Sequence, residues 1–106
     1  MQKQNQPLSL ERRINANRSY IYTENCVICG QTENYAKAAT ALKSLGKDVY
    51  AKQTPLFIGW QQEAAEIGLP MPFVYDCDTE QYETVENIEK MSEQELKAWL
   101  GIDDGK

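Results

Sequence analysis

The sequence predicts a single α/β domain built on a four-stranded mixed sheet that helices flank. Three features support this prediction: strand-like and helix-like segments alternate, glycines follow two of the predicted helices, and a short turn joins the last two predicted strands. The length of 106 residues suits one ordinary domain. A composition of 42% hydrophobic and 25% charged residues is typical of globular proteins.

The first half of the domain is predicted to form a strand, a helix and a second strand. Aromatic and β-branched residues predict a strand over residues 19–23. From about Val27 to Leu45, apolar residues recur at steps of three or four, which predicts a helix, and Gly46 stands where a terminating glycine is expected. Residues 48–52 then predict a short buried strand.

The second half is predicted to form a helix, two strands and a final helix. Residues 54–67 predict a helix, because a threonine and a proline suit its start and a glycine follows its end. Residues 71–75 and 81–85 predict two strands that form an antiparallel hairpin. Residues 92–95 match a capping box and predict the start of the last helix.

The resulting order, β-α-β-α-β-β-α, predicts a thioredoxin-like fold over residues 18–102. A strand, helix and strand in succession form a parallel pair with a right-handed crossover, and the hairpin adds antiparallel pairing, so the sheet is mixed. Residues 1–17 are rich in Gln and Asn and predict a flexible tail. Their few apolar residues (Leu8, Leu10 and Ile14) leave open a short helical turn packed against the domain.

The segment Cys26-Val27-Ile28-Cys29 is the candidate redox site. Cys26 is predicted to lie between a strand end and a helix start, where free N–H groups and the helix dipole stabilise a thiolate and lower the pKa of the cysteine. Cys29 is expected one turn later, within disulfide reach and more deeply buried. We therefore expect Cys26 to be the nucleophile that attacks a substrate disulfide and Cys29 to resolve the mixed disulfide.

Other interpretations of the cysteines stay open. A Cys-x-x-Cys also supplies half of a zinc site, but the chain has only one further cysteine, Cys77, and no histidine, so no metal site is predicted. The pair could also be merely structural. We expect Cys77 to be a half-buried hydrophobe whose pKa is raised by Asp76 and Asp78, with a regulatory or glutathionylated thiol as the alternative.

Net charge and apolar runs limit the expected partners and location. The formal net charge of −5 argues against nonspecific nucleic-acid binding, for which a basic surface is expected. The apolar runs are far too short to span a membrane, and the N-terminal residues lack the apolar block of a secretory signal. We expect a cytoplasmic monomer that binds neither nucleic acid nor membrane.

Three segments of the chain together resemble the glutaredoxin family: Tyr20–Cys29, the Ala- and Leu-rich helix predicted to end at Gly46, and Met71–Val74. The resemblance covers about residues 18–100 and is closest to short dithiol forms, such as phage-type glutaredoxins and the hydrogen donors of ribonucleotide reductase. It implies a cis-proline that faces the two thiols, which we expect to be Pro72 because it immediately precedes the predicted strand, with Pro70 as the alternative. It also implies that the backbone of Met71 binds an extended substrate.

Further residues are expected to contact the substrate. We expect Val27 and Ile28, between the cysteines, to form part of this surface, and Tyr22 either to line the same groove or to pack in the core. The resemblance also places Glu86 where the family binds the amino group of glutathione.

Three departures from the family pattern leave the reductant open. No basic residue precedes Cys26, Glu83-Thr84 stands where the family has Gly-Gly, and no proline separates the cysteines. The family uses the basic residue and the two glycines to bind glutathione. Glutathione and a thioredoxin reductase therefore both remain as electron sources, and no bound cofactor is expected.

The sequence as a whole predicts a thiol–disulfide oxidoreductase that reduces disulfides in protein substrates. By the resemblance, its partner is an enzyme such as ribonucleotide reductase. One alternative is a binding module without turnover that senses redox state or holds a metal. Another is a reductase of a small oxyanion such as arsenate.

Overall fold

The sheet confirms the predicted fold class. The computed structural model describes residues 16–102. Its four strands lie in the order β2-β1-β3-β4: β1 (Arg18–Thr23), β2 (Asp48–Gln53), β3 (Phe73–Asp76) and β4 (Gln81–Thr84). β1 pairs parallel with β2 and antiparallel with β3, and β3 pairs antiparallel with β4. This mixed sheet, flanked by helices, is a thioredoxin-like arrangement.

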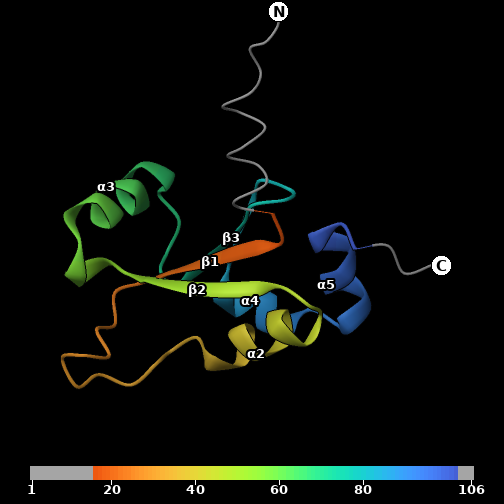
Figure 1. Ribbon diagram of the computed structural model, residues 1–106, viewed down its shortest axis with the longest axis horizontal. Coiled ribbons are helices and arrows are strands. Elements are labelled where there is room, and N and C mark those ends of the chain that lie inside the picture. The colour runs from red at the N-terminus through yellow and green to blue at the C-terminus, as the bar shows by residue number, and fades with distance from the viewer. Residues whose placement is uncertain (1–15, 103–106) are drawn as a thin grey trace, which may run out of the picture.

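Helices cover both faces of the sheet (Figure 1). On one face lie α2 (Ala36–Ser44) and α4 (Val85–Lys90), which bury the larger apolar core together with α5 (Glu93–Leu100). On the other face lies α3 (Ile58–Ile67), which follows the short 3-10 helix η1 (Thr54–Leu56). Successive side chains of a strand point to opposite faces, so Ile21 joins the larger core and Tyr22 packs on the α3 side.

The helix predicted from Val27 is shorter than expected, because α2 begins only at Ala36. Gly30 has a φ of +97°, a left-handed conformation that takes the chain out of a right-handed helix. Beyond it, Asn25 Nδ2 donates to the Thr32 carbonyl at 2.6 Å. Such bonds from short polar side chains compete with helical hydrogen bonding and hold the segment before α2 in a loop.

Two other elements differ from the prediction. β2 is an edge strand whose residues are exposed or half-buried, so it is not the buried strand expected over residues 48–52. The fourth strand ends at Thr84, and Val85 begins α4, a helix that the sequence analysis missed. The Thr84 side chain accepts the Asn87 N–H at 3.2 Å and caps this helix, which explains the early end of the strand.

Asn17, the last residue of the predicted tail, is hydrogen-bonded to the domain. The Asn17 N–H donates to the Asp78 carboxylate, its Nδ2 donates to the Gly46 carbonyl at 2.6 Å, and its carbonyl accepts the Asp48 N–H at 2.9 Å. Residues 1–15, where a flexible tail or a helical turn was predicted, lie outside the described residues. Within residues 16–102, no helix combines the length and apolar character needed to cross a membrane.

Candidate redox site

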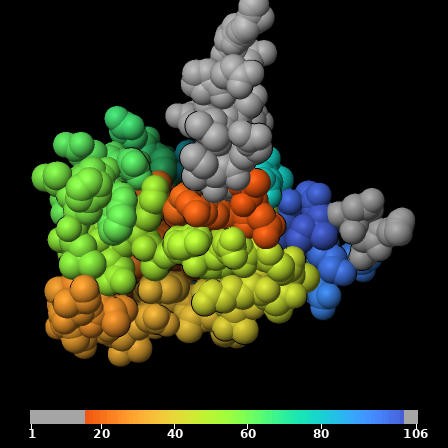
Figure 2. All heavy atoms as spheres, in the orientation of Figure 1, coloured from red at the N-terminus to blue at the C-terminus, as the bar shows by residue number. Residues whose placement is uncertain are grey.

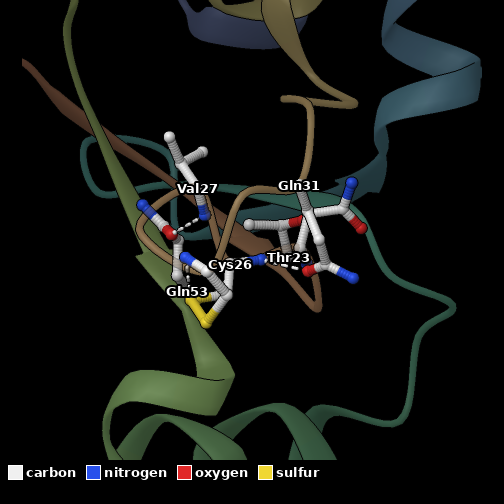
Figure 3. The surroundings of a disulfide bond; sticks show 7 residues. Thr23, Cys26, Val27, Gln31 and Gln53 are labelled. Carbon is white, nitrogen blue, oxygen red and sulfur yellow. Dashed lines mark hydrogen bonds between the residues drawn. A yellow bond between two sulfur atoms is a disulfide. The ribbon is translucent and has the colours of Figure 1, made fainter.

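Cys26 and Cys29 form a disulfide in a turn that follows β1 (Figure 3). The turn is closed by the Cys29 N–H, which donates to the Cys26 carbonyl at 3.1 Å, and by the Gly30 N–H, which donates to the Val27 carbonyl at 3.0 Å. These bonds bring the two Cα atoms to 5.1 Å, within the usual range for a disulfide. The predicted pairing of the two sulfurs is therefore present.

Two glutamine side chains hold this turn in place. The Cys26 N–H donates to Gln31 Oε1 at 2.6 Å, and the Val27 N–H donates to Gln53 Oε1 at 2.7 Å (Figure 3). Gln53 is the last residue of β2, so the second bond ties the turn to the edge of the sheet. The sequence analysis missed both residues, because nothing in the local pattern shows that a distant amide accepts these bonds.

The exposure of the two cysteines is the reverse of the expectation. Cys26 is 1% exposed, whereas Cys29 is exposed. Cys26 follows the buried end of β1 closely, but Cys29 lies in the turn, and the helix that was expected to bury it starts only at Ala36. The prediction that Cys29 is the more buried cysteine is therefore wrong.

The predicted electrostatic effect of a helix on Cys26 is also wrong. α2 begins ten residues after Cys26, and the influence of a helix end fades within about one turn. Instead of a helix end, one backbone group lies beside the sulfur: the Cys29 N–H donates to Cys26 Sγ at 3.2 Å. In the reduced protein this N–H would stabilise a thiolate on Cys26 by a local hydrogen bond.

Pro72 lies at the end of the sheet that carries the cysteines. Its peptide bond with the preceding residue is cis. In the register of β1 and β3, Tyr22 pairs with Phe73, so Pro72 comes beside Thr23, the last residue of β1. The Pro72 carbonyl accepts the Val85 N–H at 2.9 Å, which joins this end of the sheet to the start of α4.

The other predicted substrate residues divide into exposed and packed ones. Val27 and Ile28 are 39% and 81% exposed beside the disulfide. Tyr22 is buried, and its hydroxyl donates to Glu63 on α3 at 2.8 Å, so it packs in the core rather than lining a surface groove. Met71 is half-buried against the same α3-side cluster.

Glu83 and Thr84, where the resemblance would place Gly-Gly, serve to start α4. Glu83 Oε2 accepts from Asn87 Nδ2 at 2.7 Å, and Thr84 caps the helix. Glu86 is exposed in the first turn of α4 and forms an ion pair with Lys90 at 3.4 Å. This segment therefore presents carboxylates and bulky side chains where the resemblance would place an open backbone.

Cys77 lies far along the sheet from the disulfide. Its N–H donates to the carbonyl of Arg18, at the start of β1, whereas Cys26 follows the end of that strand. Cys77 is free and half-buried, and burial, together with Asp76 and Asp78, raises the pKa of its thiol, as the sequence predicts. Within the described part of the chain, no three His, Cys, Asp or Glu side chains gather as a metal site requires.

Comparison with known proteins adds no relative. No protein-family model, curated protein or solved structure matches this chain. The comparisons therefore show no family for this chain.

Removal of the Gln31 acceptor is expected to destabilise the oxidised protein more than removal of the Gln53 acceptor. Gln31→Ala leaves the buried Cys26 N–H unpaired, at a cost of about 1–3 kcal/mol, whereas water can reach the more exposed Val27 N–H after Gln53→Ala. Urea unfolding of both variants measures the difference. Gln31→Glu keeps an acceptor oxygen and serves as the control, and equal losses in the two alanine variants would contradict the assignment.

Proposed function

We propose that this protein is a thiol–disulfide oxidoreductase of glutaredoxin type. The observation that carries the proposal is the disulfide between Cys26 and Cys29, which lies at the end of a central strand of a thioredoxin-like sheet with one of its cysteines exposed. In the proposed cycle, a thiolate of the reduced pair attacks a substrate disulfide and forms a mixed disulfide. The second sulfur then attacks the first and releases the reduced substrate. The pair loses two electrons and two protons, and the substrate gains them.

An exposed apolar surface supports a protein as the substrate. This surface comprises Val27, Ile28, Leu56, Phe57 and Ile58, which are between 39% and 81% exposed. The hydrogen bond from the Val27 N–H to Gln53 links the turn that carries Val27 and Ile28 to the segment over residues 54–58. In the space-filling view, this turn (orange) lies against the segment that follows β2 (yellow-green) (Figure 2). Exposed apolar patches beside a reactive group are typical of protein interaction sites.

The charges near the disulfide favour a protein reductase over glutathione as electron source. The chain from Thr23 to Ala36 contains no basic residue that would bind a glutathione carboxylate. Lys52, on β2, is already engaged by the Glu63 carboxylate at 3.1 Å and by the Tyr22 hydroxyl. A thioredoxin reductase, which presents its own protein surface, suits an apolar and cation-poor site better.

The remaining parts of the proposal follow the resemblance. The protein would work in the cytoplasm as a monomer without a bound cofactor. It would supply electrons to an enzyme whose own cysteines are oxidised to a disulfide during its reaction, such as ribonucleotide reductase. Pro72 and the Met71 backbone would guide the substrate chain past the cysteines.

Reduction of insulin disulfides tests the proposed function. The wild type is expected to be active, and Cys26→Ser and Cys29→Ser are each expected to fall below about one per cent of its rate, because the cycle needs both sulfurs. Cys77→Ser is the matched control and should keep its activity, since Cys77 lies away from the pair. Parallel assays with glutathione plus glutathione reductase, and with thioredoxin reductase plus NADPH, identify the reductant. Unchanged turnover of Cys26→Ser would refute the proposal, and a disulfide that forms reversibly without turnover would favour a redox-sensing module.

A further inference from the structure

We propose that a row of four tyrosines across the sheet is a docking site for the N-terminal segment of this chain, residues 1–15. This tyrosine row comprises one residue from each strand: Tyr50, Tyr20, Tyr75 and Tyr82. The proposed function uses none of these residues, so the inference does not depend on it.

The register of the sheet places the four tyrosines in one line. Tyr20 on β1 pairs with Tyr50 on β2 and with Tyr75 on β3. Tyr75 in turn pairs with Tyr82 on β4, and the centroids of these two rings lie 4.7 Å apart. Paired residues of neighbouring strands point to the same face of a sheet. Tyr20 and Tyr75 pack against the α3-side cluster, so the tyrosine row lies on that face.

α3 covers only part of this face. Its Ala64 is buried together with Tyr22 and Phe73, the next pair toward the cysteines on the same face. In Figure 1, α3 lies toward the end of β1 that leads to the redox turn. At the two ends of the tyrosine row, Tyr50 is 46% exposed and Tyr82 is 44% exposed. Exposed aromatic side chains that form a continuous surface are typical of an interaction site.

The positive charges at the β2 end of the row have carboxylates beside them. Lys52 Nζ lies 3.1 Å from Glu63 Oε1. Arg18, whose guanidinium lies over the Tyr50 ring, pairs with Asp48 in the register of β1 and β2. This end of the row therefore has no excess of either charge.

The β4 end of the row has an excess of negative charge. Glu66 and Glu80 are exposed and line an open hollow together with Tyr82 and the apolar Ile67 and Leu69. Among residues 16–102, no lysine or arginine pairs with either of these two carboxylates. Carboxylates beside apolar and aromatic side chains favour a partner that carries both cations and apolar groups.

The composition of residues 1–15 matches this requirement. One lysine and two arginines against one glutamate give the segment a formal charge of +2, whereas the remaining residues carry −7. Its side chains nearest to β1 include three apolar ones, Leu8, Leu10 and Ile14, and the adjacent pair Arg12 and Arg13. Arginine stacks on tyrosine rings and pairs with carboxylates, so the segment complements the row in charge and in apolar character.

The segment also joins the domain close to the row. Asn17 is fixed by the Asp78 carboxylate and by the Gly46 carbonyl, and Tyr20 follows three residues later. Four strands span about 14 Å, because neighbouring strands lie about 4.8 Å apart. Residues 8–15 reach about 26 Å when extended, so they are long enough to cross the row. Because the segment is tethered there, docking is intramolecular and needs no high protein concentration.

Trypsin tests the proposal on the full-length protein, because it cleaves after Arg12 and Arg13. Cleavage at these two bonds is expected to be at least about tenfold slower than in a synthetic peptide of residues 1–17, since a docked segment is cut only while it is released. Tyr50→Ser/Tyr82→Ser should remove most of this protection, and Glu66→Gln/Glu80→Gln should remove part of it. Mass spectrometry measures the cleavage rates, and circular dichroism confirms that the variants fold.

Leu56→Ser/Phe57→Ser is the matched control. These side chains are 45% and 54% exposed but lie outside the row, so this variant should keep the protection of the wild type. Cleavage of the wild type at the rate of the free peptide would overturn the proposal. So would protection that survives both the tyrosine and the glutamate substitutions, because the segment would then dock elsewhere. Protection that increases with protein concentration would assign the row to a second copy of the chain and would also overturn it.

Discussion

Lys47→Met is expected to lower the free energy of unfolding by about 3–5 kcal/mol, because it leaves the buried carboxylate of Asp76 without its cation. Lys47 Nζ lies 2.9 Å from Asp76 Oδ1 and 2.8 Å from Asp78 Oδ2. Asp76 is fully buried at the end of β3, and Lys47 is also buried. Removal of one partner of a buried ion pair costs more than the pair itself contributes, since the remaining charge keeps its desolvation penalty.

The contacts of Asp76 explain why it cannot move to water when Lys47 is lost. Its Oδ1 also accepts the Ser19 hydroxyl at 2.8 Å, and its Oδ2 accepts the Thr79 N–H and hydroxyl, each at 3.0 Å. These bonds fix the carboxylate between the start of β1 and the turn after β3. The charge therefore stays buried in the variant.

Urea unfolding measures this loss, and an exposed lysine provides the matched control. Lys90 forms an exposed ion pair with Glu86, so Lys90→Met should change stability by less than about 0.5 kcal/mol. The double variant Lys47→Met/Asp76→Asn should recover part of the loss, because it removes the unpaired charge. Equal effects of the two lysine substitutions would contradict the buried pair.

The pH dependence of stability gives a second readout of Lys47→Met. Burial lowers the pKa of Lys47, but its bonds to Asp76 and Asp78 outweigh burial and raise this pKa overall. The stabilisation is therefore present below the ordinary lysine pKa of about 10.4 and is lost as the pH rises through the higher folded-state value. Burial raises the pKa of Asp78, but bonds from Lys47 and the Asn17 N–H lower it overall. That contribution is present above about pH 4 and is lost as the pH falls through the lower folded-state value. In Lys47→Met, both the loss of stability at high pH and the loss of stability at low pH should be smaller than in the wild type.

The features of the fold that the sequence predicts are those that local chemistry determines. Gly46 and Gly68 have φ values of +91° and +79°, the left-handed conformation expected after a helix. Ser92 and Glu95 exchange both hydrogen bonds of the predicted capping box. Such signals act within a few residues, so the sequence alone locates the helix ends that depend on them.

The start of α2 is not determined in this way. A cysteine at a strand end, followed by apolar residues at helical spacing, favours a helix from Val27. The left-handed Gly30 and the bond from Asn25 to the Thr32 carbonyl prevent it, and these depend on how the loop folds back on itself. The relative exposure of the two cysteines follows from this difference, so the sequence predicts the pair but not which of its two residues is the more exposed.

The side-chain packing on the α3 face also cannot be predicted from the periodicity of apolar residues. Periodicity places Leu56 on the apolar face of the predicted helix, but η1 precedes α3 and Leu56 is exposed. The chain turns at Phe57, whose extended backbone separates the two helices. The exposed part of the apolar surface thus arises from a break in a helix that the sequence predicts as continuous.

Phe73→Ala is expected to cost about 3–5 kcal/mol of stability, because Phe73 fills the core between the sheet and α3. Its side chain is fully buried and stacks on Tyr22, with ring centroids 4.8 Å apart and planes 15° apart. Tyr22 in turn bonds to Glu63 on α3, so a cavity at Phe73 removes the support for that helix as well. Urea unfolding is the measurement, and Phe73→Leu should lose less because it leaves a smaller cavity.

Phe57→Ala is the control that separates the core from the apolar surface. Phe57 is 54% exposed, and its ring forms a T-shaped pair with Trp60 at 5.3 Å between centroids, so its loss should cost less than about 1 kcal/mol. Because Phe57 belongs to the surface proposed to bind protein substrates, the same variant should raise the KM for insulin and leave the reaction with cystamine unchanged. A loss of stability equal to that of Phe73→Ala would place Phe57 in the core and remove one of the five residues from the proposed docking surface.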